Sequence, residues 1–169
     1  MASNFEFISS VNSNNITATV NLDNVFSANY DVYKLIVTDF VPASSENLAF
    51  RLLDSSGSAL SGSDYDVATA ILRNNTTFGE VRATGTTMWT YGGYTLNSNT
   101  TGFGLEMDIY NPFNSTYTFA KLNSVNGSGA DMGNINIYVY KQAASTRGVQ
   151  LSAVGGNLTD LKASIYGVK

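Results

Sequence analysis

Acidic side chains are the residues of this sequence whose spacing could support chemistry. Asp64 and Asp66 lie two apart in a serine-rich segment, and Glu106 and Asp108 have the same spacing in an alternating segment. Two carboxylates at a defined separation suffice for glycoside hydrolysis, and carboxylate oxygens also bind calcium. Residues two apart on a strand face the same side, however, so Glu106 and Asp108 fit a solvated strand face. We therefore predict a solvated strand face and a solvated turn, not a catalytic pair or a metal site.

Other catalytic residue types are missing. The sequence contains no histidine and no cysteine. This excludes imidazole acid–base catalysis, thiol nucleophiles, disulfides and the usual zinc ligand sets. No serine has the spacing to lysine or glycine that marks the known serine nucleophiles. We predict that the protein is not an enzyme and holds no cofactor.

Aromatic residues are concentrated between positions 88 and 94. This segment contains Trp89, the only tryptophan, together with Tyr91 and Tyr94. If exposed, these three rings could stack on a sugar or anchor a protein partner. The alternative, which we favour, is that Trp89 anchors the core and the tyrosines form cross-strand pairs.

Composition and charge limit the partners. Charged residues make up 13% of the chain, about half the usual share of roughly 25%. The net charge is −4 and the nine basic residues are scattered, so nucleic acid is not an expected partner. No apolar stretch approaches the roughly 20 residues of a membrane-spanning helix, and the N-terminus lacks the features of a secretory signal. We expect a soluble protein that forms a single domain over residues 1–169.

Alternation of apolar and polar residues is the main structural signal, and it predicts an all-β fold. Turn-forming clusters of Asn, Ser, Gly and Pro separate the alternating segments at the spacing of a sandwich or barrel. Residues 65–73 are ambiguous between a strand and a short helix, and residues 123–133 are expected to form a loop. The other expected strands are 5–9, 16–22, 30–37, 48–53, 86–91, 104–110, 116–121, 134–140 and 161–168. We predict an antiparallel β-sandwich of about 8–10 strands, whose winding could be jelly-roll or immunoglobulin-like.

Two parts of the chain resemble structural proteins of marine tailed bacteriophages. One is the segment 29–37, with its Tyr30-x-x-Tyr33 pattern, followed by Pro42 and by a strand with Arg51 at residues 48–53. The other is the C-terminal segment from Gly155-Gly156 to the closing Ile165-Tyr166-Gly167. The resemblance implies a jelly-roll-like sandwich whose first and last strands pair. It implies no catalytic residues.

The resemblance also implies a function in the virion, which would assemble in the host cytoplasm. Its most concrete form is a capsid decoration (cement) protein that binds the major capsid protein in many copies, as a homo-oligomer in the particle. A tail appendage or fibre-attachment subunit that binds tail proteins is the nearest alternative. Edge strands are plausible assembly sites. The candidates here are the first strand, with Phe5, Phe7 and Ile8, and the last strand at residues 161–168. A carbohydrate-binding module that uses Trp89, Tyr91 and Tyr94 is the remaining alternative.

Overall fold

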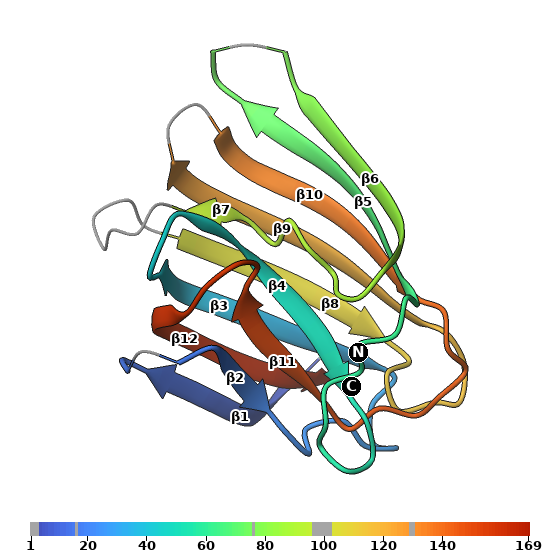
Figure 1. Ribbon diagram of the computed structural model, residues 1–169. Coiled ribbons are helices and arrows are strands. Elements are labelled where there is room, and N and C mark those ends of the chain that lie inside the picture. Colours follow the sequence, from blue (N-terminus) through green and yellow to red (C-terminus); the bar gives the residue numbers. More distant parts are fainter. Residues whose placement is uncertain (1–3, 16, 76, 96–102, 129–130) are drawn as a thin grey trace.

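Two antiparallel sheets make up the part of the chain that the computed structural model describes, residues 4–15, 17–75, 77–95, 103–128 and 131–169 (Figure 1). These residues contain twelve strands and no helix. The strands are β1 (Phe5–Ser13), β2 (Thr19–Leu22), β3 (Val32–Pro42), β4 (Glu46–Leu53), β5 (Tyr65–Arg73), β6 (Gly79–Thr86), β7 (Tyr94–Thr95), β8 (Phe103–Tyr110), β9 (Thr118–Ser128), β10 (Asp131–Tyr140), β11 (Gly148–Ala153) and β12 (Leu158–Val168).

The winding is that of a jelly roll with two added hairpins. The large sheet has the order β1-β12-β3-β8-β9-β10-β5-β6, and the small sheet has the order β2-β11-β4-β7. Without the antiparallel pairs β5–β6 and β9–β10, the sheets reduce to β1-β12-β3-β8 and β2-β11-β4-β7, the two four-stranded sheets of a jelly roll. The first and last strands pair antiparallel, from Phe5 opposite Val168 to Ser13 opposite Leu161. The expected jelly-roll-like β-sandwich is therefore confirmed.

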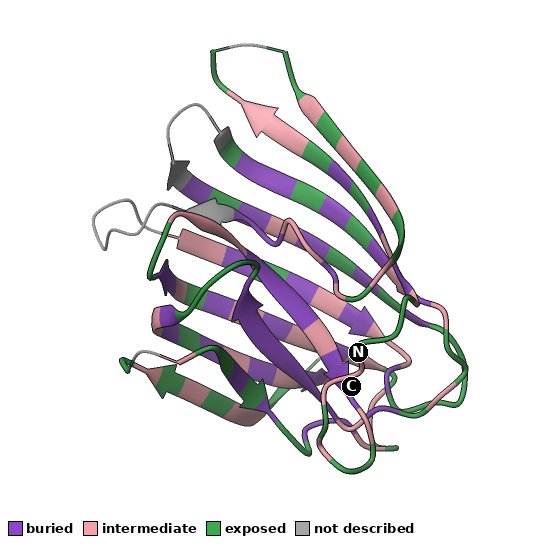
Figure 2. Ribbon diagram, in the orientation of Figure 1, coloured by how far each residue is buried: buried purple, intermediate pink, exposed green. Residues whose placement is uncertain are grey.

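The core lies where the small sheet covers the large one (Figure 2). On β3 the side chains of Tyr33, Leu35 and Val37 are fully buried, while the residues between them are partly exposed. This alternation is what a half-buried strand requires. The added strands β9, β10, β5 and β6 extend the large sheet beyond the small one (Figure 1), so their inner face needs another cover.

The segment between β6 and β7 provides part of that cover. Trp89 exchanges backbone hydrogen bonds with Phe50 of β4, at 2.9 and 3.0 Å, and so prolongs the small sheet by one bridge. Its side chain stacks on Tyr138 of β10 and meets Tyr65 of β5 edge-on. The added strands are thereby attached to the same core as the jelly roll.

Several expected elements differ in the structure. Residues 65–73 form a strand. The expected strand at 86–91 was wrong, because Thr86 ends β6 and residues 87–91 contribute only the bridge at Trp89. The expected loop at 123–133 was wrong, because β9 continues to Ser128 and β10 begins at Asp131. Its polar side chains Ser124 and Asn126 face inward and are buried, which hides the strand from a hydrophobicity pattern. Strands β6, β7 and β11 were not predicted, and the total of twelve exceeds the expected 8–10.

Candidate interaction surfaces

Trp89 is a core residue, so the glycan-platform alternative loses its principal side chain. The indole is 0% exposed, and its Nε1 donates a hydrogen bond to the carbonyl oxygen of Val139 at 3.1 Å. The rings of Tyr138 and Tyr65 occupy its face and edge at centroid distances of 5.3 and 5.6 Å. A buried tryptophan with a satisfied N–H is a packing anchor. The expectation that Trp89 anchors the core is confirmed.

Tyr91 lies beside this anchor and has a structural function. Its backbone adopts the left-handed region with φ 61°, and its carbonyl oxygen accepts hydrogen bonds from the amides of Asn134 and Asn136. The Tyr138 hydroxyl donates to the carbonyl oxygen of Thr90 at 2.7 Å. Polar side chains on the inner face of β10 thus hold residues 90 and 91 in place. In return, the carbonyl oxygens of these two residues satisfy the buried donors of β10. Tyr94 belongs to β7, but its side chain lies outside the described residues.

The acidic pair on β8 is bound by a lysine side chain. Lys34 lies between the two carboxylates of β8, with its Nζ 2.7 Å from Asp108 and 3.2 Å from Glu106. A hydrogen bond from Asn123, followed by the contact with Lys34, lowers the pKa of Glu106. A carboxyl group with a lowered pKa is ionised near neutral pH, so Glu106 is not suited to act as a general acid.

The second acidic pair is divided between two contacts. The Lys141 ammonium and the N–H of Gly85 lower the pKa of Asp66, while Asp64 accepts a hydrogen bond from Gln142 at 2.7 Å. No cluster of three or more potential metal-ligating side chains occurs among the described residues. Both acidic pairs fit the solvated surface that the spacing predicts.

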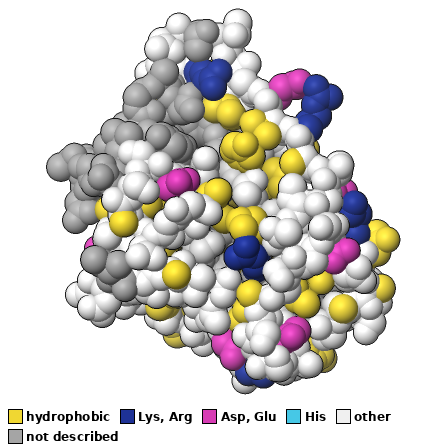
Figure 3. Space-filling view, viewed as in Figure 1, with side chains coloured by type: hydrophobic (Ala, Val, Ile, Leu, Met, Phe, Trp, Pro, Cys, Tyr) yellow, Lys and Arg dark blue, Asp and Glu magenta, His cyan; other side chains and the backbone are white. Residues whose placement is uncertain are grey.

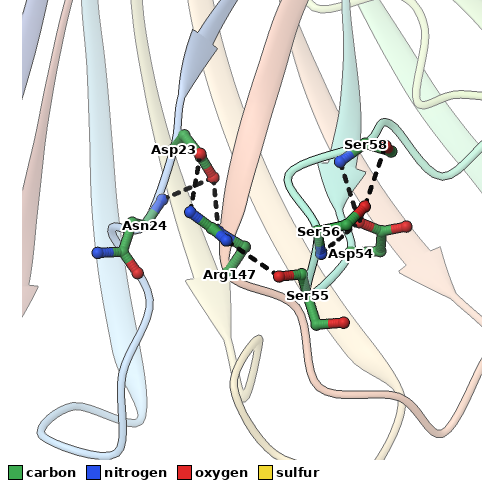
Figure 4. Close-up of polar contacts among 7 residues, drawn as sticks. All are labelled: Asp23, Asn24, Asp54, Ser55, Ser56, Ser58 and Arg147. Atoms are coloured by element: carbon green, nitrogen blue, oxygen red, sulfur yellow. Dashed lines mark hydrogen bonds and ion pairs between the residues drawn. The ribbon is translucent and has the colours of Figure 1, made fainter.

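Arg147 connects three loops at one end of the sandwich (Figure 4). Its guanidinium contacts both carboxylate oxygens of Asp23, at 2.8 and 2.9 Å, and donates to the carbonyl oxygen of Ser55 at 3.0 Å. The carboxylate of Asp54 accepts from the N–H groups of Ser56 and Ser58 within the neighbouring turn. In these contacts the charged groups are paired with one another or with the backbone. We therefore interpret the cluster as a structural link between the loops.

Strand β1 is an edge strand that carries exposed aromatic side chains. It ends the large sheet, so one of its two edges has no partner strand among the described residues. The other expected edge strand, residues 161–168, was wrong, because it belongs to β12, which pairs with β1 on one side and with β3 on the other. Phe5 and Phe7 are 55% and 59% exposed, and both rings contact Tyr166 of β12 edge-on. Ile8 lies at a bulge, where the register shifts between Phe7 and Ser9, and packs against the core. The structure therefore places Phe5 and Phe7, but not Ile8, at a surface open to a partner.

Further exposed hydrophobic side chains, which sequence reasoning missed, lie on the added strands. Phe119 and Val125 of β9 and Ile135 and Ile137 of β10 are 42–66% exposed. The alternation of β10 indicates that its isoleucines share a face, but not that this face is the outer one. Burial of Asn134, Asn136 and the β10 tyrosines on the inner face is what turns the isoleucines outward.

The opposite side of the molecule is mostly uncharged. Viewed from the small sheet, its surface is dominated by uncharged polar groups, with a few charged side chains and a hydrophobic group below the β5–β6 hairpin (Figure 3).

The described residues include no helix that could span a membrane. No protein-family model matches the chain, and no curated protein matches it.

Proposed function

We propose that this protein is a non-enzymatic structural component of a tailed-bacteriophage particle, a decoration protein that binds the major capsid shell. The observation that carries the proposal is the open edge of β1, with Phe5 and Phe7 exposed beside its unpaired backbone groups. Such an edge can accept a strand from a neighbouring subunit, while exposed aromatic rings supply most of the contact energy. The jelly-roll winding with paired end strands supports it as well.

A capsid protein that acts by contact needs area and repetition rather than a catalytic cleft. A standard interface buries about 1,600 Å² in total, and its repetition by symmetry multiplies the effect of each weak contact. The uncharged polar surface fits a protein that assembles in the host cytoplasm beside nucleic acid without binding it. A tail appendage subunit would use the same edge against tail proteins.

Location in the particle tests the proposal. Mass spectrometry of separated heads and tails should find the chain on heads, in copy numbers comparable to that of the major capsid protein. A few copies on tails would assign it to an appendage instead. Absence from purified particles would refute the virion function altogether.

The surface that binds heads is tested by point variants. Replacing Phe5 and Phe7 together by serine should weaken binding to heads that lack the protein by about tenfold or more. The matched control is Phe113→Ser, which also removes a partly exposed ring but lies outside the strands. Equal loss in both variants would contradict the assignment to β1.

A further inference from the structure

The outer face of the large sheet is covered by no described element, yet it is not a polar face. The small sheet packs on the other side (Figure 1). An antiparallel sheet with one solvated face normally directs polar residues outward. Among the described residues eleven large hydrophobic side chains are exposed, and the register places six of them on this face: Phe5, Phe7, Phe119, Val125, Ile135 and Ile137.

The strand registers arrange this face in rows that cross the sheet. One row is apolar over six adjacent strands, Phe5, Val168, Val32, Tyr110, Phe119 and Val139. The next row is charged at its centre and apolar on both sides, Phe7, Tyr166, Lys34, Asp108, Lys121, Ile137 and Ala68. The third contains Ile36, Glu106, Asn123, Ile135 and Ala70.

Two hollows interrupt the same face. One, of about 290 Å³, is lined by Gly104, Glu106, Asn123 and Val125 and lies between β8 and β9. The other, of about 280 Å³, lies over β10, β5 and β6 and is lined partly by Ala68, Arg82 and Ile137. The first hollow is on the midline of the eight-stranded sheet, beside the side chain of Val125, which is 66% exposed.

We propose that this outer face binds a second copy of the chain, face to face, about a two-fold axis that runs along the midline between β8 and β9. An interface with two-fold symmetry uses the same patch twice. An axis between β8 and β9 therefore places each residue of β8 opposite its own β9 partner in the other copy. Phe119 then meets Tyr110 of the second copy, and Val125 meets the hollow at Gly104.

Charge complementarity favours a second copy over an unrelated partner. Across the proposed axis Lys121 meets Asp108 of the other copy, and Asn123 meets Glu106. One strand further out, Val139 meets Val32 and Ile135 meets Ile36. Most apolar groups of these rows thus face apolar groups, and Lys121 and Asp108 face opposite charges. Lys34 lies opposite Ile137 and keeps its ion pairs with Asp108 and Glu106 of its own chain. A partner of a single charge sign would meet repulsion from one half of this pattern.

The area is sufficient for a specific dimer. Strand twist of roughly 20° per strand turns the sheet edges away, so contact is confined to the central strands. Six strands at about 4.8 Å spacing and eight residues at about 3.4 Å rise span roughly 780 Å² in projection. Standard interfaces bury about 800 Å² per partner. The proposal does not depend on the virion function, since it concerns the purified protein alone.

Sedimentation equilibrium of the purified chain tests the proposal. We expect a monomer–dimer equilibrium, with a dissociation constant that Val125→Asp raises by about tenfold or more. The matched control Val154→Asp, on a side chain that is 42% exposed in the connection between β11 and β12, should leave the constant unchanged within about twofold. A chain that stays monomeric up to about 1 mM, or a dimer that Val125→Asp does not weaken, would overturn the proposal.

A charge exchange tests the axis itself. Asp108→Lys and Lys121→Glu each place like charges opposite one another in a homodimer, so each variant alone should be monomeric. An equimolar mixture should form heterodimers, because the lysine introduced at position 108 then meets the glutamate introduced at position 121, and the native Lys121 meets the native Asp108. Thermal unfolding first establishes that both variants fold. If one of them does not, the comparison of Val125→Asp with Val154→Asp tests the proposal instead. A mixture of folded variants that remains monomeric would overturn the two-fold arrangement.

Discussion

Trp89 connects the two parts of the sandwich through a single side chain. It joins β4 by backbone hydrogen bonds, β10 and β5 by ring contacts, and the carbonyl oxygen of Val139 through its indole N–H. Removal of a fully buried ring leaves a cavity as well as a lost N–H contact. We expect Trp89→Ala to lower the free energy of unfolding by about 3–5 kcal/mol.

Denaturant unfolding followed by circular dichroism measures that loss, with Phe78→Ala as the control. Phe78 is 68% exposed, so its truncation should change the free energy of unfolding by less than about 0.5 kcal/mol. The wild-type emission should be blue-shifted and unaffected by polysaccharides. A red-shifted emission that glycans quench would contradict the buried anchor.

Strands could be predicted from the sequence where one face is apolar and the other polar. This holds for β3 and β8, whose inward residues alternate with Lys34, Glu106 and Asp108. It fails for β11, because every residue of that strand is buried and no alternation remains. It also fails for β6, an edge strand that buries none of its residues fully. Period-two alternation therefore reports one-sided burial and not strand formation itself.

Pairing of β2 with β11 depends on a close backbone approach at Gly148. A Cβ atom at this position would lie 2.3 Å from the carbonyl oxygen of Leu22, and a backbone atom within a strand cannot move aside easily. We expect Gly148→Ala to lower the free energy of unfolding by about 1–3 kcal/mol. At Gly156 the nearest atom is the Ser44 hydroxyl at 3.4 Å, so Gly156→Ala is the matched control and should have little effect. Similar unfolding midpoints for both variants would contradict this account.

The arrangement of the whole molecule depends on pairings between distant parts of the chain. Alternation indicates which residues share a face of one strand, but not which strand lies beside it. For this reason Phe5 could be proposed as an edge residue, whereas its place in one apolar row with Tyr110 and Phe119 could not. The choice between jelly-roll and immunoglobulin-like winding was open for the same reason. Trp89 alone was a correct core candidate, because tryptophan is large enough to bridge two sheets.

Between about pH 8 and pH 2, the stability of the whole molecule should change only at the acidic end. Contacts in the folded protein lower the pKa of four carboxyl groups. The main contacts are Lys169 at Glu6, Ser56 at Asp54, Lys141 at Asp66 and Asn123 at Glu106. A carboxyl group with a lowered folded pKa binds protons more readily when unfolded. Its stabilising contribution is therefore present above the unfolded pKa of about 4 and is lost as pH falls toward the folded value.

The thermal midpoint should therefore be level between about pH 8 and 5 and fall below about pH 4. No histidine is present to add a transition between these limits. Differential scanning calorimetry at low salt measures the profile. Asp54→Asn is the informative variant, because its amide cannot be protonated in this range and the acid slope should become shallower. A step in the midpoint between pH 5 and 7 would contradict the account, since it would require a group whose pKa is raised and not lowered by folding.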